Sequence, residues 1–223
     1  MTTSLRLMTA NLLHEYCDAA DFARILEKHD PDVVVTQELG PRAADVLASA
    51  YPNHRIRPAL DFTGRGIATR LEAEFGDIDM PGRDGTSAVF EVDGSPLRLA
   101  GIHLLNPVNF PWWSTVRDRR AQLDGLFDWI ERSRGPVLVA GDFNASPRWP
   151  AYRQVRARLV DLVAEWADRA GTEAERTWAY RPGWPRLLRI DHVFGRGVVA
   201  TGVSVDTIRG TDHHPVIVDL ELT

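Results

Sequence analysis

The sequence contains very little cysteine and very little lysine. Cys17 is the single cysteine among the 223 residues, so no disulfide bond can form within the chain. Lys28 is the single lysine, and nearly all of the positive charge is therefore carried by arginine. We interpret the arginine content as codon bias in a GC-rich genome, with the good fit of the guanidinium group to phosphate as the alternative.

Long hydrophobic runs are also missing. No segment approaches the roughly 20 apolar residues of a membrane helix. The N-terminal stretch, MTTSLRLMTAN, contains no apolar run as long as that of a signal peptide. These two absences predict a cytoplasmic protein without a transmembrane segment.

The chain has no excess of positive charge. Its formal net charge is −5, which disfavours tight, non-specific binding to a long polyanion. This value does not exclude a local basic groove, for which the sequence offers Arg65, Arg117, Arg119, Arg120 and Arg186. The composition is ordinary for a soluble globular protein, and no repeat, low-complexity tract or linker divides the chain. We therefore predict a single domain over residues 1–223, and we expect it to be a monomer.

Residues 135–147, GPVLVAGDFNASP, carry the strongest local signal. The apolar run VLVA at 137–140 is typical of a strand buried on both faces. It leads into GDFN, in which Asp142 and Asn144 stand two positions apart. These side chains point the same way if the strand geometry continues. The alternative is an ordinary turn, because Gly, Asp and Asn favour turns for local reasons.

Apolar periodicity predicts strands and helices along the whole chain. Strands are predicted at residues 4–10, 32–37, 64–70, 72–78, 86–92, 96–103, 137–140, 190–194, 198–207 and 216–222. Helices are predicted from the Asp18 cap to Pro31, after Pro41, at 114–133 and at 151–166, with loops at 106–113, 177–185 and 210–215. Asp93-Gly94 is a strong hairpin signal.

The polar residues with the greatest chemical potential share one position, at or beside a predicted strand end. They are Asn11, Glu38, His103, Asp142, Asn144, Asp191, Asp212 and His213. If the strands are layered into a sandwich, these ends can converge on one rim, where binding sites of layered α/β folds often gather.

Six short strings, in this order, resemble the endonuclease/exonuclease/phosphatase superfamily, the metal-dependent phosphoesterases similar to DNase I. They are TANL with Asn11, TQEL with Glu38, GIHLL with His103, AGDFNASP with Asp142 and Asn144, RIDHVF with Asp191, and GTDHHPV with Asp212 and His213. Each string alone is weak, but six in order form a strong signal. GRGIATR, RTW and GTDHHPV resemble the small bacterial branch that includes VanJ-like proteins. VanJ-like proteins carry membrane segments ahead of the domain, and we expect no such segment in this chain.

The resemblance implies an α/β fold, a four-layered sandwich with two mixed β-sheets packed face to face and helices outside. It also implies hydrolysis of a phosphoester with Mg²⁺ or Mn²⁺. A hard cation held by oxygen ligands neutralises the substrate's charge and stabilises the leaving oxygen. Glu38 is the predicted direct ligand, Asn11 supplies a neutral carbonyl oxygen, and Asp212 supplies a further carboxylate, directly or through water.

The remaining site residues are assigned to the phosphate and the attacking water. Asp142 is predicted to orient or deprotonate the water, and Asn144 to donate to a phosphate oxygen or hold Asp142. His213 is predicted to contact the phosphate, while Asp191 accepts from its other ring nitrogen and favours the cationic form. His103 is a second donor. Whether His213 acts as a base or as a charged clamp is left open by the sequence.

Two predicted loops beside these motifs carry aromatic residues, namely Trp112, Trp113, Trp178, Tyr180 and Trp184. They form either a wall for a base, sugar or lipid tail or a layer that packs the loops on the core, and we prefer packing for Trp178. Arg119 stands three residues before Gln122, and for it we prefer a buried structural role over phosphate contact.

The leading hypothesis is a Mg²⁺-dependent phosphoesterase that acts on a small or lipid-linked phosphate compound. The alternative is a nuclease, such as an apurinic-site endonuclease or an exonuclease-like enzyme, which the acidic charge and the lack of a basic arm disfavour. A third hypothesis is a non-catalytic binding module, against which the full set of catalytic residue types argues. A fold does not choose among these substrates.

Overall fold

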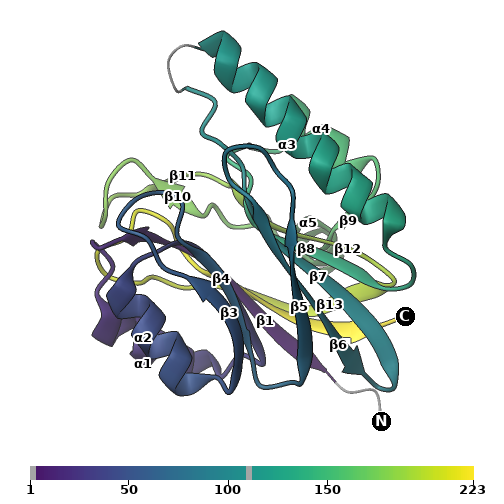
Figure 1. The fold of residues 1–223 in the computed structure, drawn as a ribbon, viewed down its shortest axis with the longest axis horizontal. Coiled ribbons are helices and arrows are strands. Elements are labelled where there is room, and N and C mark those ends of the chain that lie inside the picture. The colour runs from purple at the N-terminus through teal and green to yellow at the C-terminus, as the bar shows by residue number, and fades with distance from the viewer. Residues whose placement is uncertain (1–3, 109–111) are drawn as a thin grey trace.

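Two six-stranded β-sheets pack face to face, and helices lie on their outer sides (Figure 1). The structure is a computed structural model that describes residues 4–108 and 112–223, except for the side chain of Trp112. The predicted four-layered arrangement of two mixed sheets with outer helices is confirmed. None of the described helices combines the length and the apolarity needed to cross a membrane.

The first sheet contains the N-terminal and C-terminal strands. Its order is β13 (Val198–Val205), β14 (Val216–Leu222), β1 (Leu5–His14), β2 (Val33–Leu39), β4 (Arg65–Thr69) and β3 (Asn53–Arg57). Strands β1 and β2 run parallel, and the other neighbours run antiparallel. The sheet is therefore mixed, as predicted.

The second sheet contains the middle of the chain. Its order is β5 (Ala73–Ile78), β6 (Gly85–Val92), β7 (Ser95–His103), β8 (Val137–Asp142), β12 (Asp191–Arg196) and β9 (Val160–Asp161). Only β7 and β8 run parallel among these pairs. The predicted hairpin joins β6 to β7, and Asp93 and Gly94 both have positive φ angles, 52° and 72°, as a type I′ turn requires.

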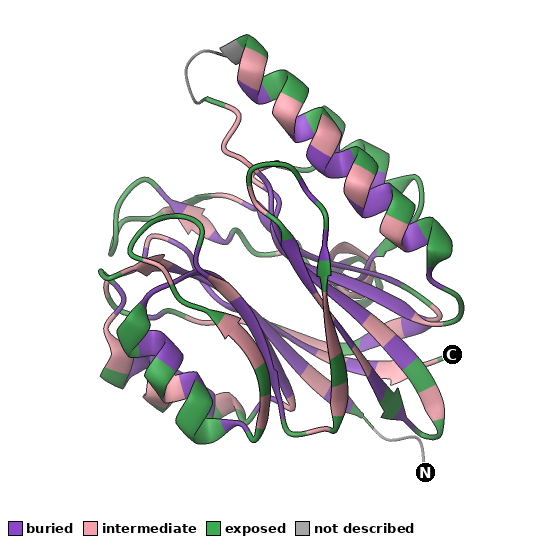
Figure 2. Cartoon of the chain, viewed as in Figure 1, coloured by how far each residue is buried: buried purple, intermediate pink, exposed green. Residues whose placement is uncertain are grey.

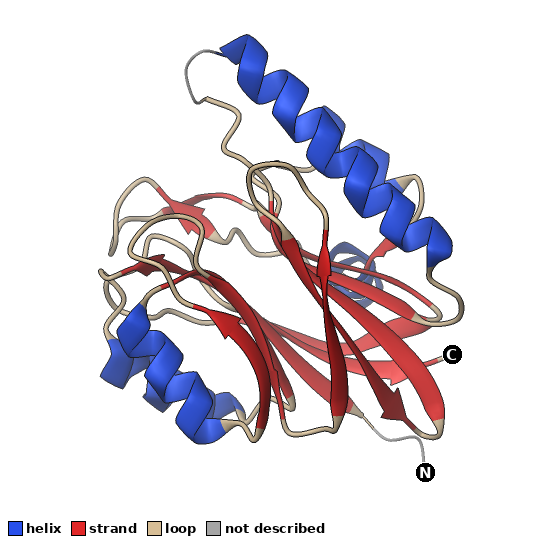
Figure 3. Ribbon diagram, viewed as in Figure 1, coloured by secondary structure: helices blue, strands red, loops and turns tan. Residues whose placement is uncertain are grey.

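Five helices among the described residues complete the layers (Figure 3). They are α1 (Ala19–His29), α2 (Pro41–Ala50), α3 (Trp112–Arg132), α4 (Pro150–Arg156) and α5 (Leu162–Ala170). Helix α1 begins where the sequence predicts, because the carboxylate of Asp18 accepts from the backbone N–H groups of Ala20 and Asp21. Apolar side chains pack α1 and α2 against the first sheet, and α3 and α4 against the second.

The core between the sheets is formed by the unbroken apolar runs of the central strands. Every residue of β2 and of β8 is buried (Figure 2). Val33 and Val35 from β2 share one cluster with Leu138 and Ala140 from β8. These strands are buried on both faces, which explains why their sequences are continuous rather than alternating.

Four parts of the chain differ from the prediction. Strand β3 was not predicted, because an edge strand of sequence NHRIR has no fully buried face and lacks a clear apolar alternation. The predicted helix 151–166 is interrupted after α4, where β9 pairs with β12. Trp112 and Trp113 begin α3 instead of lying in a loop.

The predicted aromatic loop 177–185 contains strand β10 (Trp178–Ala179), which pairs with β11 (Arg186–Leu188). These strands are too short to show any periodicity, so only pairing with other parts of the chain reveals them.

The strand register brings the predicted site residues to one end of the sandwich. In the second sheet, His103 lies opposite Asp142, and Asp142 lies opposite Asp191. In the first sheet, Asn11 lies opposite Gln37, the residue before Glu38. The side-chain amide of Asn11 on β1 donates to the carboxylate of Asp142 on β8, so side chains of the two sheets meet at this end.

Candidate active site

The GDFN turn depends on a close approach of two strands. Gly141 has φ 146°, and a Cβ atom at this position would lie 2.0 Å from the carbonyl oxygen of Ile102. Only glycine therefore allows β8 to pass β7 this closely. Asp142 follows as the last residue of β8, and the fully buried Phe143 anchors the turn.

Two predicted site residues have the left-handed backbone conformation that non-glycine residues rarely adopt. The φ angle is 49° at Glu38 and 45° at Asn144. Leu13 and His14, at an irregularity in β1 after Asn11, also have positive φ angles. Such residues cost free energy and persist where the surrounding structure holds them, often at functional sites. The concentration of these residues at one edge of the sheets supports the prediction that a functional site lies there.

Asp142 is the centre of the site's hydrogen bonds and is almost fully buried. The side-chain amides of Asn11 and Asn144 each lie 3.1 Å from its Oδ2 atom, and the backbone N–H of Asn144 donates to Oδ1 at 2.7 Å. Burial by itself would raise the pKa of this carboxyl. The charge of His213 and the hydrogen bond from the backbone N–H of Asn144 outweigh burial and hold the pKa well below its usual range.

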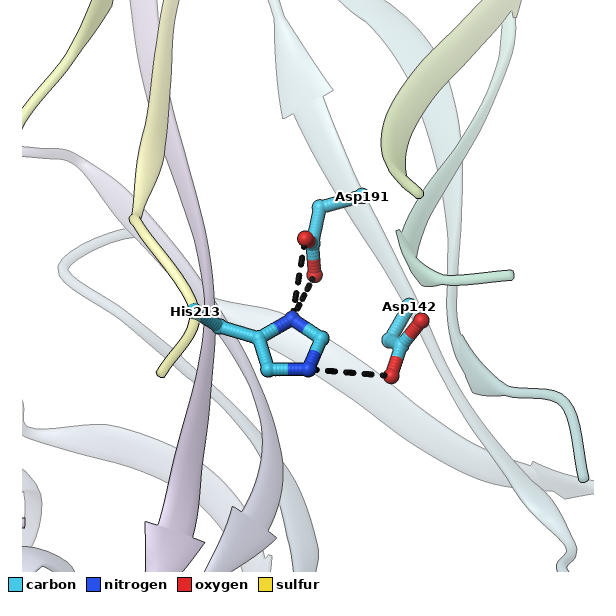
Figure 4. Close-up of side chains that lie close together, drawn as sticks. All are labelled: Asp142, Asp191 and His213. Atoms are coloured by element: carbon cyan, nitrogen blue, oxygen red, sulfur yellow. Dashed lines mark hydrogen bonds and ion pairs between the residues drawn. The ribbon is translucent and has the colours of Figure 1, made fainter. Parts of the chain in front are cut away.

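His213 lies between two aspartates (Figure 4). Its Nδ1 atom is 3.0 Å from Oδ2 of Asp191, and its Nε2 atom is 3.8 Å from Oδ2 of Asp142. Burial lowers the pKa of the imidazole, but the negative charges of Asp191 and Asp142 overcome this effect and raise it to about 10. His213 is therefore cationic near neutral pH, and its predicted pairing with Asp191 is present.

The carboxylate of Asp191 is held in place by Thr177. The hydroxyl of Thr177 donates to its Oδ2 atom at 2.6 Å and accepts from the backbone N–H of Asp191 at 3.1 Å. Burial raises the pKa of Asp191, against the lowering effect of the His213 charge. Thr177 thus fixes the carboxylate that fixes the imidazole.

His103 meets a residue that the sequence analysis did not select. Nη1 of Arg83 lies 2.6 Å from Nε2 of His103. This Nε2 atom of His103 also lies 3.4 Å from Oδ2 of Asp142. Because a guanidinium group has no acceptor, Nε2 of His103 accepts in this contact. Burial lowers the pKa of Arg83, against the charges of Glu38 and Asp142.

Arg83 lies between β5 and β6, in a turn that opens toward the cleft. A signal was present in the sequence, since an arginine in the PGRDG turn precedes a strand whose partner ends at His103.

The acidic residues proposed as metal ligands carry unsatisfied oxygen atoms. Oε2 of Glu38 and Oδ1 of Asp212 are buried and have no hydrogen-bond partner among the described residues. Oδ1 of Asn11 accepts from the backbone N–H of Leu13 at 3.1 Å, and its amide nitrogen donates to Oε1 of Glu38 at 3.1 Å. Buried carboxylate oxygens without donors fit a hard cation. In this arrangement, the oxygen of Asn11 is already engaged.

The short hairpin β10–β11 is attached to the loop that carries Asp212 and His213. The indole N–H of Trp178 donates to Oδ2 of Asp212 at 3.1 Å, and the backbone N–H of Ala179 donates to the Asp212 carbonyl at 2.9 Å. Trp178 is half-buried and lines the cleft, so it both packs the hairpin and orients a predicted metal ligand.

A buried polar chain supports the GDFN turn from the core side. His192 lies 2.8 Å, through Nε2, from the carbonyl oxygen of Ala145, and its Nδ1 lies 3.1 Å from Nη1 of Arg189. Arg189 pairs with Asp161 at 2.8 Å, and the hydroxyl of Tyr152 donates to the same carboxylate at 2.6 Å. Burial and the Arg189 charge lower the pKa of His192 to about 4. A neutral His192 therefore donates to Ala145 and accepts from Arg189.

Arg119 has the structural role that the sequence analysis preferred. Its guanidinium group donates to the carbonyl oxygens of Phe143 and Asn144 at 3.2 and 3.3 Å, and to that of Leu105. Gln122 accepts from the backbone N–H of Leu105 at 3.0 Å. Together they join the start of α3 to the two loops beside the site.

The polar groups open into a cleft of about 460 Å³. Its floor carries Glu38, His103, Asp142, Asn144, Asp212 and His213, with Arg83 at the side. Its walls include Leu13, Phe62, Pro107, Val108, Trp149, Trp178 and Tyr180. Two predicted residues do not line the cleft but contact residues that do: Asn11 donates to Asp142, and Asp191 accepts from His213. All eight predicted site residues are therefore gathered together.

The predicted aromatic wall is present in part. Tyr180 lines the cleft, and Trp184 lies beside it with ring centroids 6.1 Å apart. Trp113 is exposed on the first turn of α3. The side chain of Trp112 lies outside the described residues. Phe62 and Trp149 also line the cleft and were not predicted to do so, although Trp149 stands only two residues after the AGDFNASP string.

Relatives and solved structures resemble this chain. A UPF0294 protein of Yersinia pestis is 33% identical over 135 residues, which cover 58% of this chain and 44% of that protein. A UPF0294 protein of Vibrio cholerae is 30% identical over 130 residues, which cover 58% of this chain and 42% of that protein. The chain therefore spans less than half the length of these relatives.

Solved structures match almost the whole chain. Danio rerio TDP2 complexed with single strand DNA product has a TM-score of 0.78 at 20% identity, covering 98% of this chain and 99% of that chain. The 3′ phosphatase NExo from Neisseria, bound to a product DNA hairpin, has a TM-score of 0.73 at 18% identity, with coverage of 98% and 99%. The human Nocturnin catalytic domain with bound sulfate has a TM-score of 0.73 at 16% identity, with coverage of 100% and 97%. These likenesses show a shared fold.

The family comparison is the most direct. The match to the family described as Endonuclease/Exonuclease/phosphatase extends over residues 8–213, from β1 to the loop that carries His213. It includes every predicted site residue. With its sandwich of two mixed sheets and its cleft at the strand ends, this chain belongs to the endonuclease/exonuclease/phosphatase family.

Proposed function

We propose that this protein is a Mg²⁺- or Mn²⁺-dependent phosphoesterase that hydrolyses a small or lipid-linked phosphate ester. One observation carries the proposal. A buried, ionised Asp142 stands between a cationic His213 and the carboxylate of Glu38, which has an unsatisfied oxygen, at the floor of an open cleft. This arrangement offers both a position for a cation and donors for a phosphate.

The metal site centres on Glu38. Its Oε2 atom and Oδ1 of Asp212 are buried carboxylate oxygens that have no hydrogen-bond partner among the described residues. A bound Mg²⁺ supplies positive charge that stabilises the phosphate and the leaving oxygen. Asn11 donates to both Glu38 and Asp142, so it orients the two carboxylates. Its role as a carbonyl ligand stays a prediction, and it requires the amide group to turn.

Asp142 is suited to orient the attacking water. A carboxylate whose pKa lies below its usual range holds a proton weakly, so it accepts a hydrogen bond better than it removes a proton. Asn144 keeps Asp142 in place through its backbone and side-chain N–H groups. We therefore assign Asp142 to water positioning, with its low proton affinity set mainly by the charge of His213.

His213 is suited to hold the phosphate as a charged clamp. Its Nδ1–H donates to Asp191, which leaves the Nε2–H for an oxygen of the substrate at the cleft floor. A preorganised cation in a site that excludes water stabilises developing negative charge strongly. Arg83 adds a second cation beside His103, and its guanidinium geometry suits two phosphate oxygens.

The competing function is cleavage of a nucleic acid. It is favoured by two structural neighbours, Danio rerio TDP2 complexed with a single strand DNA product and NExo bound to a product DNA hairpin. Binding to a long polyanion is disfavoured by the net charge of −5. We expect weak binding to duplex DNA at physiological salt and a shallow dependence on salt, because few phosphates would be neutralised.

The test is a metal-dependent screen of the intact chain over phosphomonoesters, phosphodiesters, pyrophosphates and abasic DNA. We expect turnover of a compact or lipid-linked substrate with Mg²⁺ or Mn²⁺, and loss of turnover with excess chelator and in Asp142→Asn. Efficient, steeply salt-dependent cleavage of DNA would instead support the nuclease. Absence of turnover on every class would support the binding module.

A further inference from the structure

The exposed apolar side chains are concentrated at one end of the molecule. Among the described residues, the large exposed apolar side chains other than Val160 either line the cleft or lie within eight residues of one that does, and we call this set the apolar rim. It comprises Tyr16, Leu60, Phe62, Val108, Trp113, Val116, Trp149, Tyr180, Trp184 and Leu187. The hairpin β10–β11 and the loop that leads to α3 lie at the same end of the sandwich (Figure 1).

The apolar rim is continuous with the candidate active site. Phe62, Val108, Trp149 and Tyr180 line the cleft, yet each keeps at least a third of its surface exposed, and Val108 is 79% exposed. A large exposed apolar area around a site marks a surface that meets an apolar partner. The partner would thus approach the cleft directly.

Arginines stand among the apolar side chains of the rim. The guanidinium carbon of Arg181 lies 5.8 Å from the ring centre of Tyr180 and 5.6 Å from that of Trp184. Arg148 is exposed next to Trp149, and Arg117 and Arg120 are exposed on the first turns of α3. Exposed acidic residues also occur here, at Glu15, Asp61 and Asp84, and Arg117 is paired with Asp118 at 2.9 Å. The arginines nevertheless give the rim cationic groups on a chain whose net charge is −5.

We propose that the apolar rim docks on an anionic lipid bilayer, so that the cleft faces the phosphoester of a lipid at the membrane surface. Tryptophan, tyrosine and arginine side by side suit the headgroup level, where an apolar body and a polar or charged end are both satisfied. Anionic lipids attract the arginines. The docking stands on the rim alone, whereas the lipid as substrate rests on the proposed function.

A bilayer fits the rim better than a single-stranded nucleic acid does. Bases stack on aromatic rings, and the rim's aromatic residues would serve that purpose. Leu60, Val116 and Leu187 have no aromatic face and gain nothing from stacking, although they are 66%, 59% and 49% exposed. Their transfer from water into the acyl boundary is favourable for any apolar side chain.

The hairpin connects the rim with the catalytic loop. Tyr180 follows Ala179, whose backbone N–H donates to the carbonyl of Asp212, and Trp178 donates to the carboxylate of the same residue. Contact of Tyr180 and Trp184 with a headgroup layer would therefore place the bilayer next to Asp212 and His213. The lipid phosphate would be within the reach of the cleft without leaving the surface.

The experiment measures co-sedimentation of the full chain with vesicles of phosphatidylcholine alone and of phosphatidylcholine with phosphatidylglycerol. The test variant is Leu60→Ser/Val116→Ser/Trp184→Ser, and the matched control is Val160→Ser, an exposed apolar residue outside the rim. We expect binding to the anionic vesicles, at least ~10-fold weaker binding of the triple variant, and no change in the control. Circular dichroism and thermal unfolding verify that each variant is folded. Arg181→Gln should weaken binding to the anionic vesicles only.

The Asp142→Asn variant should bind vesicles as the unsubstituted chain does, which separates docking from hydrolysis. Failure of the unsubstituted chain to bind anionic vesicles, or equal binding by the folded triple variant, would overturn the docking. Binding of a single-stranded oligonucleotide that vesicles do not compete for, and that the triple variant loses, would assign the rim to nucleic acid. A dimer that the triple variant loses, seen by light scattering without vesicle binding, would assign the rim to a second copy of the chain.

Discussion

The imidazole of His213 and the carboxylate of Asp191 form a buried pair in which Nδ1 lies 3.0 Å from Oδ2. Neither side chain is more than 8% exposed. The pair lies opposite Asp142, so a single cationic ring faces two carboxylates (Figure 4). This relationship determines the charge of the site near neutral pH and leads to a prediction on stability.

The apo-protein should lose stability as the pH rises from about 6.5 to about 10. The pKa of His213 is raised in the folded state from 6.5 to about 10, so the folded chain keeps a proton that the unfolded chain releases. The resulting stability is fully present below pH 6.5 and is lost as the pH passes the folded pKa, at no more than ~1.4 kcal/mol per pH unit. Urea unfolding in chelator across this range measures it.

His213→Gln should remove most of this slope, while His54→Gln, at an exposed position, should retain it. An unchanged slope in folded His213→Gln would contradict the assignment of the proton to this pair.

Asp142→Asn should reduce turnover by ~100-fold or more with folding intact, because the amide neither carries the charge beside His213 nor accepts from water equally well. Steady-state kinetics on the best substrate of the screen measure the change. Asp128→Asn, on the exposed surface of α3, is the matched control. Near-normal turnover in Asp142→Asn would show that the site has been placed wrongly.

Glu38→Gln should weaken binding of Mn²⁺ as well as turnover. The variant keeps the shape of the side chain but removes the negative charge of the carboxylate whose buried Oε2 atom is the predicted metal ligand. Calorimetric titration of the apo-protein with Mn²⁺ should show ~10-fold weaker affinity or more. Equal Mn²⁺ affinity in the two proteins would exclude Glu38 as a ligand, whatever its effect on turnover.

Arg83→Gln should lower kcat/KM by ~10-fold or more, since it removes a cation at the cleft wall that contacts His103 at 2.6 Å. Arg83→Lys should recover part of the loss, because it restores the charge without the two-pronged geometry. Arg57→Gln, an exposed arginine paired with Asp77, serves as the control. If Arg83→Gln has normal kinetics, Arg83 has only a local structural role.

His192→Ala should lower kcat and also reduce the free energy of unfolding by ~1–3 kcal/mol. It removes the donor to the Ala145 carbonyl and leaves Arg189 partly unsatisfied in the core. His192→Gln, which retains one donor and one acceptor, should recover activity more fully than His192→Ala. Kinetics and urea unfolding of both variants provide the comparison. Equal activity of the unsubstituted protein and both variants would show that the GDFN turn keeps its geometry without the hydrogen bonds of His192.

The sequence could predict the layers and the central strands because their signals are local. The apolar runs of β2 and β8, the Asp18 cap and the Asp93-Gly94 turn each depend on a few neighbouring residues. Strand β3 and the hairpin β10–β11 could not be predicted in this way. Their residues are stabilised by pairing across the fold, and they are too polar or too short to carry a periodic pattern. The single domain, the monomer and the VanJ-like branch stay predictions.

The sequence by itself determined which side chains the site contains. A carboxylate, an amide or an imidazole at the end of an apolar run can be recognised from the sequence alone. Only the tertiary structure decided how those groups meet. The orientation of the Asn11 amide, the contact of Arg83 with His103, the bond from Trp178 to Asp212 and the position of the apolar rim join segments far apart in the chain. Such contacts depend on strand register and on turns with positive φ angles, and a local pattern of residues contains neither.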